Sequence, residues 1–572
     1  MPAVAGAQLM AFRGFDPAPP TEYQPPTLPA TLAGLETGAT VITPVDSAEL
    51  DSLINDGGTV DGTTLAAAAA AGPVVIKLDA SASRTVPYSG WYDLPDLDNA
   101  DWIYIVSDEY DSLPASGTRV QTADRTNMVK CQPADNDAAA IYWYGLFNVL
   151  RGAEKYRFIG LECSYPAGAD VGLGLINCSA VNYTLTYLPY VSSEADIAHD
   201  IIVDRCELYG RDVSGQEESK AIVFNVINGA VLDSSIHDIA GTTSDDPQGI
   251  IVSDGRVLLF ENNSISASGE CFILGGADGF LDHIDDVVVR GNYMWKPLEW
   301  DQNLAEYDSY NRACKNIFEL KKAQRVLVEG NVFEHTWSDA QGGTAVLMTV
   351  RNQDGDDLNA IVSDINFRNN IIRNVTGAIA ITGEDDLDSS QQTQRLKITN
   401  NIFEDVTREA GNIQPIFFQF STPDRPARWV TIANNTCLTS LDEDGPYGHL
   451  RMQSATICVD ELRVTDNIML HGDYNTTWDR TANATLSGNV LAMMPDNSRY
   501  ATNVSNFATY YPTGFSMADP GVAAIGFVNA AGGDYRLDVT SDYIGTGAGG
   551  ADPGIDQDEL EAATSGAITG TW

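Results

Sequence analysis

VEGNVF, residues 328–333, is one of eight similar six-residue segments that follow one another along the chain. In each segment an apolar residue is followed by two variable residues, an Asn, one variable residue and a second apolar residue. The other seven segments are FENNSI (260–265), VRGNYM (289–294), FRNNII (367–372), ITNNIF (398–403), IANNTC (432–437), VTDNIM (464–469) and LSGNVL (486–491). Their Asn residues are 22 to 39 positions apart, and the weaker copies VDRCEL (203–208) and LDSSIH (232–237) precede them. A repeat of this period indicates a solenoid, in which each repeat forms one coil.

Apolar residues occupy every second position before the Asn, as at Val326 and Val328. This alternation is typical of a β-strand with one buried face. Asn tolerates the left-handed backbone conformation that a two-residue bend needs, and the apolar residue two places later begins the next strand. Asn side chains that are stacked at the spacing of strands can hydrogen-bond to one another along the stack. The sequence therefore predicts an all-β parallel β-helix of about 10–12 coils.

Four regions are expected along the chain. Residues 1–40 are rich in Pro and should form an extended arm, which suits the anchoring of the protein on a partner. Residues 41–100 should hold an N-terminal cap and the first coils, with a short amphipathic helix in SAELDSLINDGG and a first strand in PVVIKL. The parallel β-helix should occupy residues 101–500. The Asn pattern is lost after that, so residues 501–572 should form an irregular C-terminal cap that covers the open end of the solenoid.

The composition excludes several classes of partner. The chain has 79 acidic and 33 basic residues, which gives a formal net charge of −46. Such a surface disfavours nucleic acid, whose phosphates require a basic partner, and also disfavours anionic membranes. No apolar run is long enough to cross a membrane. Strong acidity suits a protein that stays soluble outside the cell or in salty water.

The N-terminus and the cysteines bear on the compartment. MPAVAGAQLMAFRGF lacks the cationic region and long apolar core of a secretory signal. The eight Cys residues show no C-x-x-C pair, so they indicate neither a zinc site nor a compact disulfide framework. We expect buried free thiols, Cys437 in particular, because it fills an apolar position of its repeat. The expected location is a virion or the extracellular space.

Several stretches carry a resemblance to a known group. They are LGGADG (274–279), NYMWKPLEW (292–300), NIFELKKAQRVLVEGNVFE (316–334), TVRNQDG (349–355), SQQTQR (390–395) and FVNAAGGDYRL (527–537). With the coils they resemble the right-handed parallel β-helix repeat proteins of bacteria and phages, in the pectate-lyase-like superfamily. The resemblance implies a right-handed β-helix and carbohydrate as the usual partner, because polysaccharide lyases, glycoside hydrolases and phage tailspikes share this architecture. Fold alone does not settle activity.

A basic cluster stands out in this acidic chain. Arg312, Lys315, Lys321, Lys322 and Arg325 lie within fourteen residues, where a uniform spread would put about one cation. Phe318 and Leu320 should face the core, which turns their neighbours outward.

The residues predicted to be catalytic are Lys321 or Lys322, Arg351 on the next coil, and Glu384 one coil further. An Arg beside a Lys lowers the pKa of the ammonium and makes it a general base. The Arg also neutralises a uronate carboxylate, which favours β-elimination. The pair is similar to that of the alginate lyase and chondroitinase B family. SDAQGGTAVLMTV (338–350) and RNQDG (351–355) depart from the pattern of that family.

Further residues of the same region suggest substrate binding or other chemistry. Substrate-binding candidates are Arg325, Lys296, Arg312, Lys315, Trp295, Trp300 and Trp337. A glycoside hydrolase would need two carboxylates, for which the candidates are Asp354, Asp356, Asp357, Glu384, Asp385 and Asp386. Asp354, Asp356 and Asp357 could instead bind Ca²⁺, although no EF-hand spacing is present. Under a purely structural interpretation, the cations form ion pairs with Glu319, Glu329 and Glu334.

Three functions remain open from the sequence. The first is a virion-associated tailspike or fibre-like protein that binds, and in one version cleaves, host-surface polysaccharide. Its arm, residues 1–40, would contact other virion proteins, and a homotrimer would fit. The second is a secreted bacterial polysaccharide lyase. The third is a structural or adhesive solenoid without catalysis.

Overall fold

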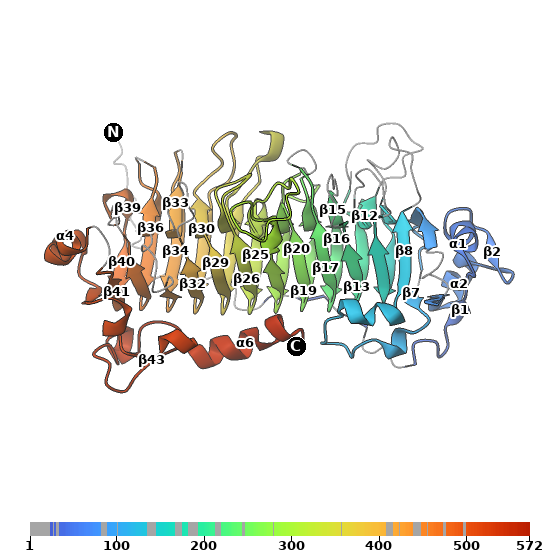
Figure 1. The fold of residues 1–572 in the computed structure, drawn as a ribbon. Helices are drawn as coiled ribbons and strands as arrows, with labels where there is room; N and C mark the ends of the chain where they lie inside the picture. The colour runs from blue at the N-terminus through green and yellow to red at the C-terminus, as the bar shows by residue number, and fades with distance from the viewer. Residues whose placement is uncertain are drawn as a thin grey trace, which may run out of the picture.

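The computed structural model describes residues 23, 25–26, 28–29, 34–81, 88–99, 101–133, 145–165, 174–180, 193–211, 219–242, 246–277, 280–355, 357–407, 416–422, 424–438, 448–454, 456–472, 476, 478–495 and 499–571. Their strands form three long parallel sheets, which we name S1, S2 and S3 in the order in which each coil visits them (Figure 1). Eleven coils contribute a strand to all three sheets within these ranges. The right-handed parallel β-helix expected from the sequence is therefore confirmed.

S1 contains fifteen strands: β1 (Thr40–Ile42), β4 (Val74–Leu78), β7 (Ile103–Ser107), β10 (Glu154–Ile159), β13 (Ala198–Asp204), β16 (Val226–Leu232), β19 (Arg256–Glu261), β22 (Asp285–Arg290), β25 (Ala323–Glu329), β28 (Val362–Arg368), β31 (Gln394–Thr399), β34 (Ala427–Ala433), β37 (Val459–Thr465), β39 (Thr481–Ala482) and β40 (Thr485–Ser487).

S2 contains fourteen: β5 (Tyr88–Gly90), β8 (Val129–Pro133), β11 (Leu161–Ser164), β14 (Glu207–Tyr209), β17 (Ser235–Ile239), β20 (Ser264–Ala267), β23 (Tyr293–Trp295), β26 (Val332–Thr336), β29 (Ile371–Val375), β32 (Ile402–Val406), β35 (Thr436–Cys437), β38 (Ile468–His471), β41 (Asn489–Met493) and β42 (Phe515–Ala518).

S3 contains eleven: β6 (Tyr92–Leu94), β9 (Phe147–Leu150), β12 (Ile176–Ala180), β15 (Lys220–Phe224), β18 (Gln248–Val252), β21 (Glu270–Leu274), β24 (Phe318–Leu320), β27 (Thr344–Met348), β30 (Gly377–Thr382), β33 (Ile416–Ser421) and β36 (Gly448–Met452). The remaining pairs are the antiparallel β2 (Thr59–Val60) with β3 (Thr63–Thr64) and β43 (Phe527–Asn529) with β44 (Asp534–Leu537).

The interior consists of apolar residues stacked in register from coil to coil. On S1, for example, Val287 pairs with Val326, Val326 with Ile365, and Ile365 with Leu396, and all four side chains are buried. Aromatic rings stack in the same way, since the centroids of Phe272 and Phe318 are 5.3 Å apart. The alternation seen in the sequence therefore produces one continuous core.

The predicted Asn ladder is confirmed. The first seven of the eight repeat Asn residues, at the turn from S1 to S2, each donate from Nδ2 to Oδ1 of the next one along the solenoid, at 2.9–3.1 Å. The last, Asn489, donates to the carbonyl groups of Val464 and Gly514. The left-handed residue of the turn is the one before the ladder Asn, such as Gly330 (φ 67°) or Asn369 (φ 56°). This explains why Gly, Asn or Asp always precedes the ladder Asn, because these residues tolerate positive φ.

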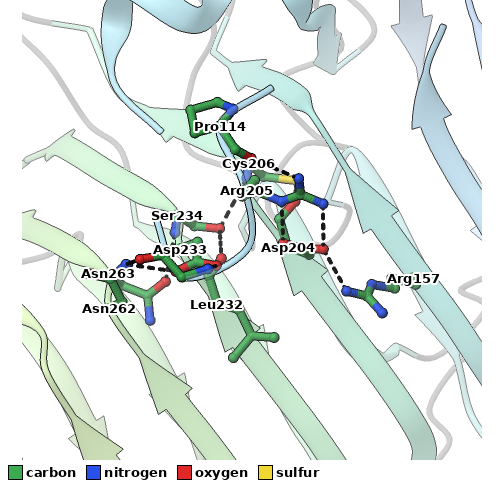
Figure 2. A network of polar contacts seen from close by, with 11 residues as sticks. Pro114, Arg157, Asp204, Arg205, Cys206, Leu232, Asp233, Ser234, Asn262 and Asn263 are labelled. Carbon is green, nitrogen blue, oxygen red and sulfur yellow. Dashed lines mark hydrogen bonds and ion pairs between the residues drawn. The ribbon is translucent and has the colours of Figure 1, made fainter. Parts of the chain in front are cut away.

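The ladder continues into the two degenerate repeats with other side chains (Figure 2). Ser234 N donates to Asn263 Oδ1 at 3.0 Å, and Cys206 N donates to Ser234 Oγ at 3.1 Å. Beyond them, Asp204 accepts hydrogen bonds from Arg157 and Arg205 at 2.7 and 2.8 Å. Burial raises the pKa of Asp204, but these two guanidinium groups outweigh it and hold the pKa below its usual value. A buried ion network thus ends the ladder.

The N-terminal region contains two helices. α1 (Ser47–Ile54) lies in the stretch expected to be helical and is capped by the Asp46 side chain, which accepts from Ala48 N and Glu49 N. α2 (Leu65–Ala71) was not expected, since its Ala-rich stretch lacks a clear apolar periodicity. β4 includes most of the expected first strand, but β1 precedes it and pairs with it in parallel.

Two described residues of the arm, Tyr23 and Leu28, pack on the outer face of S1. They cover an apolar row made by Ala230, Leu259, Val288 and Leu327. Residues 1–22, which belong to the arm of residues 1–40 where the anchoring function was expected, lie outside the described residues.

The C-terminal region is more regular than expected. It contains α4 (Tyr500–Ser505), α5 (Phe507–Tyr510) and α6 (Gln557–Thr569). After β42 the chain runs back along the body of the solenoid, so α6 lies beside its middle coils (Figure 1). No helix in the described part is long and apolar enough to cross a membrane. All eight cysteines are buried free thiols, as predicted.

Candidate functional site

An open groove on the outer face of S3 brings several of the predicted catalytic residues together. Its volume is about 620 Å³, and it crosses five consecutive coils, from β24 to β36. Lys321, Arg351 and Glu384 line it, together with Glu319 and Asp386. Three of the four predicted catalytic side chains therefore share one site.

Glu319 forms the floor of the groove. β24 turns Phe318 and Leu320 into the core, so Glu319 lies on the outer face, yet it is only 3% exposed. Its Oε2 atom has no hydrogen-bond partner within the described residues. Burial raises the pKa of Glu319 to about 7, opposed by Lys321 and assisted by Glu270. Sequence reasoning saw Glu319 only as an ion-pair partner, because its burial depends on neighbouring coils.

Lys321 and Arg351 lie on adjacent coils, as the sequence predicted. Arg351 N donates to Lys321 O at 2.9 Å. Lys321 Nζ is 3.9 Å from Glu319 Oε1, whereas Arg351 Nη1 contacts Asp385 Oδ1 at 2.6 Å and also Asp386. Burial lowers the pKa of Arg351, but these carboxylates raise it overall. The charge of Arg351 is thus already compensated, which weakens its predicted role in neutralising a uronate.

Glu384 organises a loop at the edge of the groove. Its Oε1 accepts from Asp424 N at 3.0 Å and from Arg425 N at 2.6 Å, and its Oε2 accepts from Arg425 Nε at 2.5 Å. These three hydrogen bonds hold the carboxylate in one orientation. We therefore assign Glu384 a positioning role in the wall of the groove and not the predicted catalytic role.

Lys322 does not reach the groove. Its side chain is 3% exposed, and Nζ lies 2.6 Å from Asp357 Oδ2. The expectation that either lysine could stack with Arg351 is corrected to Lys321, because the strand ends at Leu320 and Lys322 turns inward. Asp357, a predicted Ca²⁺ ligand, is the partner of Lys322 in this ion pair. The Asp354 side chain and Asp356 lie outside the described residues, so Ca²⁺ binding there stays a prediction.

Two of the predicted substrate-binding cations are buried. Lys296 is fully enclosed, and its ammonium donates to the carbonyl groups of residues 267–269 at 2.6–2.9 Å. Arg312 is 7% exposed, contacts Asp308 at 2.6 Å and stacks on Trp300 with 5.1 Å to the ring centroid. Neither cation can reach a glycan on the surface, which corrects both predictions.

Lys315 and Arg325 are engaged in ion pairs away from the groove. Lys315 contacts Asp246 and lies 3.6 Å from Glu270. Arg325 on S1 has a φ of 53° and binds Asp285 and Asp286 at 2.5 and 2.8 Å. Arg325 belongs to a row of left-handed residues, one per coil, that includes Asp286, Asp364 and Arg395. Arg325 is therefore held in ion pairs, as the structural interpretation expected, but its partners are Asp285 and Asp286 and not Glu319, Glu329 or Glu334.

The predicted stacking tryptophans are also elsewhere. Trp300 and Trp337 are each 4% exposed and pack with Ala240 and Cys314 in a small core of their own. Trp295 stacks on Tyr293 on the outer face of S2, with 5.7 Å between ring centroids. A glycan in the S3 groove would therefore meet polar and charged side chains, without these aromatic rings.

One other group of metal-ligating side chains comes together among the described residues. Glu154, His199 and Asp200 have ligand atoms within 4.8 Å of one another. Glu154 already contacts Lys155 at 3.0 Å, and Asp200 accepts from Asn228. These contacts satisfy the carboxylates without a metal.

Comparison with known proteins leaves the activity open. No family model matches the chain, and no curated protein matches it. Solved structures that resemble it include the Dettilon tailspike protein, with 10% identity over 84% of this chain and 68% of that one and a TM-score of 0.34. The alginate lyase AlyGC of the PL6 family shares 11% identity over 84% of this chain and 53% of that one, with a TM-score of 0.41.

A third similar structure is PfbA, a surface adhesin of Streptococcus pneumoniae, with 9% identity over 81% of this chain and 92% of that one and a TM-score of 0.38. This chain spans about half the length of the alginate lyase. The parallel strand register identifies the fold, and the groove on S3 is the feature that bears on function.

Proposed function

We propose that this protein binds a polysaccharide chain in the S3 groove and cleaves it by proton transfer at Glu319. The observation that carries the proposal is a buried carboxyl group with an unsatisfied oxygen on the floor of an open groove. A buried polar atom without a partner is costly. Oε2 is enclosed beneath the groove, so a substrate hydroxyl or glycosidic oxygen would contact it once the carboxyl group rotates toward the groove. The groove runs along five coils, which suits a linear polymer better than a compact ligand.

The raised pKa of Glu319 supports a role in acid–base chemistry. A group whose pKa is near the working pH can both donate and accept a proton efficiently. Burial brings the pKa of Glu319 to about 7. Lys321, 3.9 Å away, would orient an acidic sugar or stabilise the ionised carboxylate.

Two reactions fit this arrangement. In hydrolysis, protonated Glu319 would donate its proton to the glycosidic oxygen as the bond to the anomeric carbon breaks, and a second carboxylate such as Asp386 would accept a proton from the water that attacks this carbon. In β-elimination, ionised Glu319 would take the proton from the carbon next to a uronate carboxylate while the glycosidic C–O bond breaks, and would return that proton to the leaving oxygen. The compensated charge of Arg351 favours hydrolysis, because elimination needs a free cation at the carboxylate.

A binding role without catalysis is the second candidate. Glu384 and Arg351 are both held in ion pairs, as expected of a structural or adhesive solenoid. Either function fits a virion appendage that meets host-surface glycan or a secreted bacterial protein. Tyr23 and Leu28 lie on the chain's own S1 sheet, which does not favour anchoring on a partner through these two residues.

The test is turnover by Glu319→Gln on a panel of uronate and neutral polysaccharides. Reducing ends would report hydrolysis, and ultraviolet absorbance of the unsaturated product would report elimination. We expect the isosteric variant to lose about 100-fold or more in turnover while it retains binding, because only proton transfer is removed. Glu461→Gln, an exposed change on S1, is the matched control and should behave as the wild type.

The pH profile separates the two reactions. If Glu319 acts as an acid, activity falls as pH rises through about 7, because the proton is lost; if it acts as a base, activity rises over the same range. Full activity of Glu319→Gln on a cleaved glycan would exclude the proposed role. Binding without cleavage by the wild type would leave the adhesive function.

A further inference from the structure

A second groove lies on the outer face of S1, on a different sheet from the groove that contains Glu319. It has a volume of about 470 Å³, and its floor is formed by β28, β31, β34 and β37. Lys397, Thr431 and Arg463 occupy the same register position on three adjacent strands. Lys397 and Arg463 are therefore two strand spacings apart, roughly 10 Å.

The groove is unusually cationic for this chain. Arg368, Lys397 and Arg463 are among its fourteen lining residues, where the average of 33 cations in 572 residues would give about one. Arg368 is paired with Glu329 at 2.8 Å, and the acidic residues of the lining, Asp556 and Glu559, belong to the C-terminal tail. The side-chain ammonium of Lys397 makes no hydrogen bond or ion pair with any described part of the protein. In a molecule with a net charge of −46, an ammonium group without a partner is a local site of attraction for an anion.

Trp429 lines the same groove at the left-handed position that recurs once per coil on S1. Its φ is 55°, and the equivalent residues of the two preceding coils are Asp364 and Arg395, which form an ion pair at 2.6 Å. The Arg428 guanidinium lies 4.1 Å from the centroid of the Trp429 ring and holds the indole in place. In this coil an aromatic side chain, Trp429, thus takes the position that charged residues occupy in the two preceding coils.

The C-terminal tail forms a fixed wall of the groove. Asn369 Nδ2 donates to Glu559 Oε1 at 3.0 Å, and Asp556 N donates to Asn400 Oδ1 at 2.6 Å. Asn400 Nδ2 returns a hydrogen bond to Asp556 O at 3.1 Å. The wall is therefore attached to the left-handed Asn residues of the turns, so the groove is formed before any ligand arrives.

We infer that the S1 groove is a second binding site, which holds a short segment of an acidic polysaccharide. The C–H face of a sugar ring would stack on Trp429, whose π-face is electron-rich. Carboxylate or sulfate groups of the polymer would contact Lys397 and Arg463, and Thr431 would bind a hydroxyl group. The site needs no chemistry at Glu319, so it extends the proposed function and does not depend on it.

Binding to immobilised polygalacturonate, alginate and dextran sulfate tests this inference, with neutral dextran as the blank. All proteins would carry Glu319→Gln, so that no polymer is cleaved. We expect Lys397→Gln and Trp429→Ala each to weaken binding to an acidic polymer about tenfold. Lys130→Gln, on the outer face of S2, is the matched control and should bind as the parent does. Equal thermal midpoints would show that the variants are folded.

The inference is overturned if no acidic polymer binds, if dextran binds equally well, or if both groove variants bind as the parent does. Its failure can be told apart from that of the proposed function. Cleavage that depends on Glu319, with binding unaffected by Lys397→Gln and Trp429→Ala, would remove only the second site. Binding that depends on Lys397 and Trp429, without cleavage by the wild type, would remove only the catalytic role.

Discussion

Asn331 shows how much a single side chain contributes to this fold. Its amide donates to Val289 O, Glu329 O and Asn370 Oδ1 at 2.9–3.1 Å, and its Oδ1 accepts from the main chain and side chain of Asn292. The side chain is fully buried. One amide therefore satisfies polar groups of three consecutive coils that have no access to water.

Replacing Asn331 with Leu should destabilise the protein strongly. Leu keeps the branched shape at Cγ, but the Asn292 donors and the Val289 carbonyl group lose their partner inside the core. We expect a loss of roughly 3 kcal/mol or more in the free energy of unfolding, because each buried group left without a partner costs about 1–3 kcal/mol. Urea denaturation followed by circular dichroism measures this loss.

Asn359→Ala is the control for the ladder, since the exposed side chain of Asn359 hydrogen-bonds only to Asp282 in the described structure. It should change the stability by no more than about 0.5 kcal/mol. Similar midpoints for the two variants would mean that the ladder contributes little beyond ordinary burial.

Among the elements, α6 is the one whose position depends most on distant residues. Asp556 caps its N-terminus, and Gly570 ends it with a φ of 75°. Arg119 connects it to the solenoid, with Nε donating to Asn262 O and Nη2 donating to Ala567 O, both at 3.0 Å. Burial lowers the pKa of Arg119 to about 10, against the opposing charge of Asp233. A cation at the C-terminus of a helix is also favoured by the helix dipole.

Arg119→Gln should release α6 while the β-helix stays intact. The variant loses charge-assisted hydrogen bonds to two carbonyl groups, each worth about 1.5–3 kcal/mol. Amide hydrogen exchange in residues 557–569 should therefore accelerate about tenfold or more, with β28 unchanged. Arg536→Gln removes exposed ion pairs to Asp558 and Glu561 on the same helix, and should have little effect. Equal exchange in the two variants would contradict the role assigned to Arg119.

At the scale of the whole molecule, the repeated Asn was sufficient to predict the solenoid. Its signal is local, because the alternation and the bend lie within six residues. Ion pairing could not be predicted in the same way. Lys322 and Asp357 are 35 positions apart, and their meeting depends on the lengths of the loops between coils. The sequence could identify Lys321 and Arg351 as neighbours on adjacent coils. It could not show that Glu319 is buried, because that burial depends on how neighbouring coils pack. The burial raises the pKa of Glu319 and so supports acid–base chemistry in the groove.

The strong acidity of the whole chain should make its thermal stability depend on the salt concentration. Most of the described cations already have carboxylate partners, so the remaining negative charges repel one another in the folded state. Added salt screens this repulsion, with a Debye length that falls from about 30 Å at 0.01 M to about 8 Å at 0.15 M. We therefore expect the thermal midpoint at neutral pH to rise by about 2 °C or more over this range. Near the sequence pI of about 4.2 the net charge vanishes, and the same salt step should no longer stabilise the protein. A midpoint that falls with salt at neutral pH would mean that the ion pairs of S1 and S3 outweigh the net repulsion.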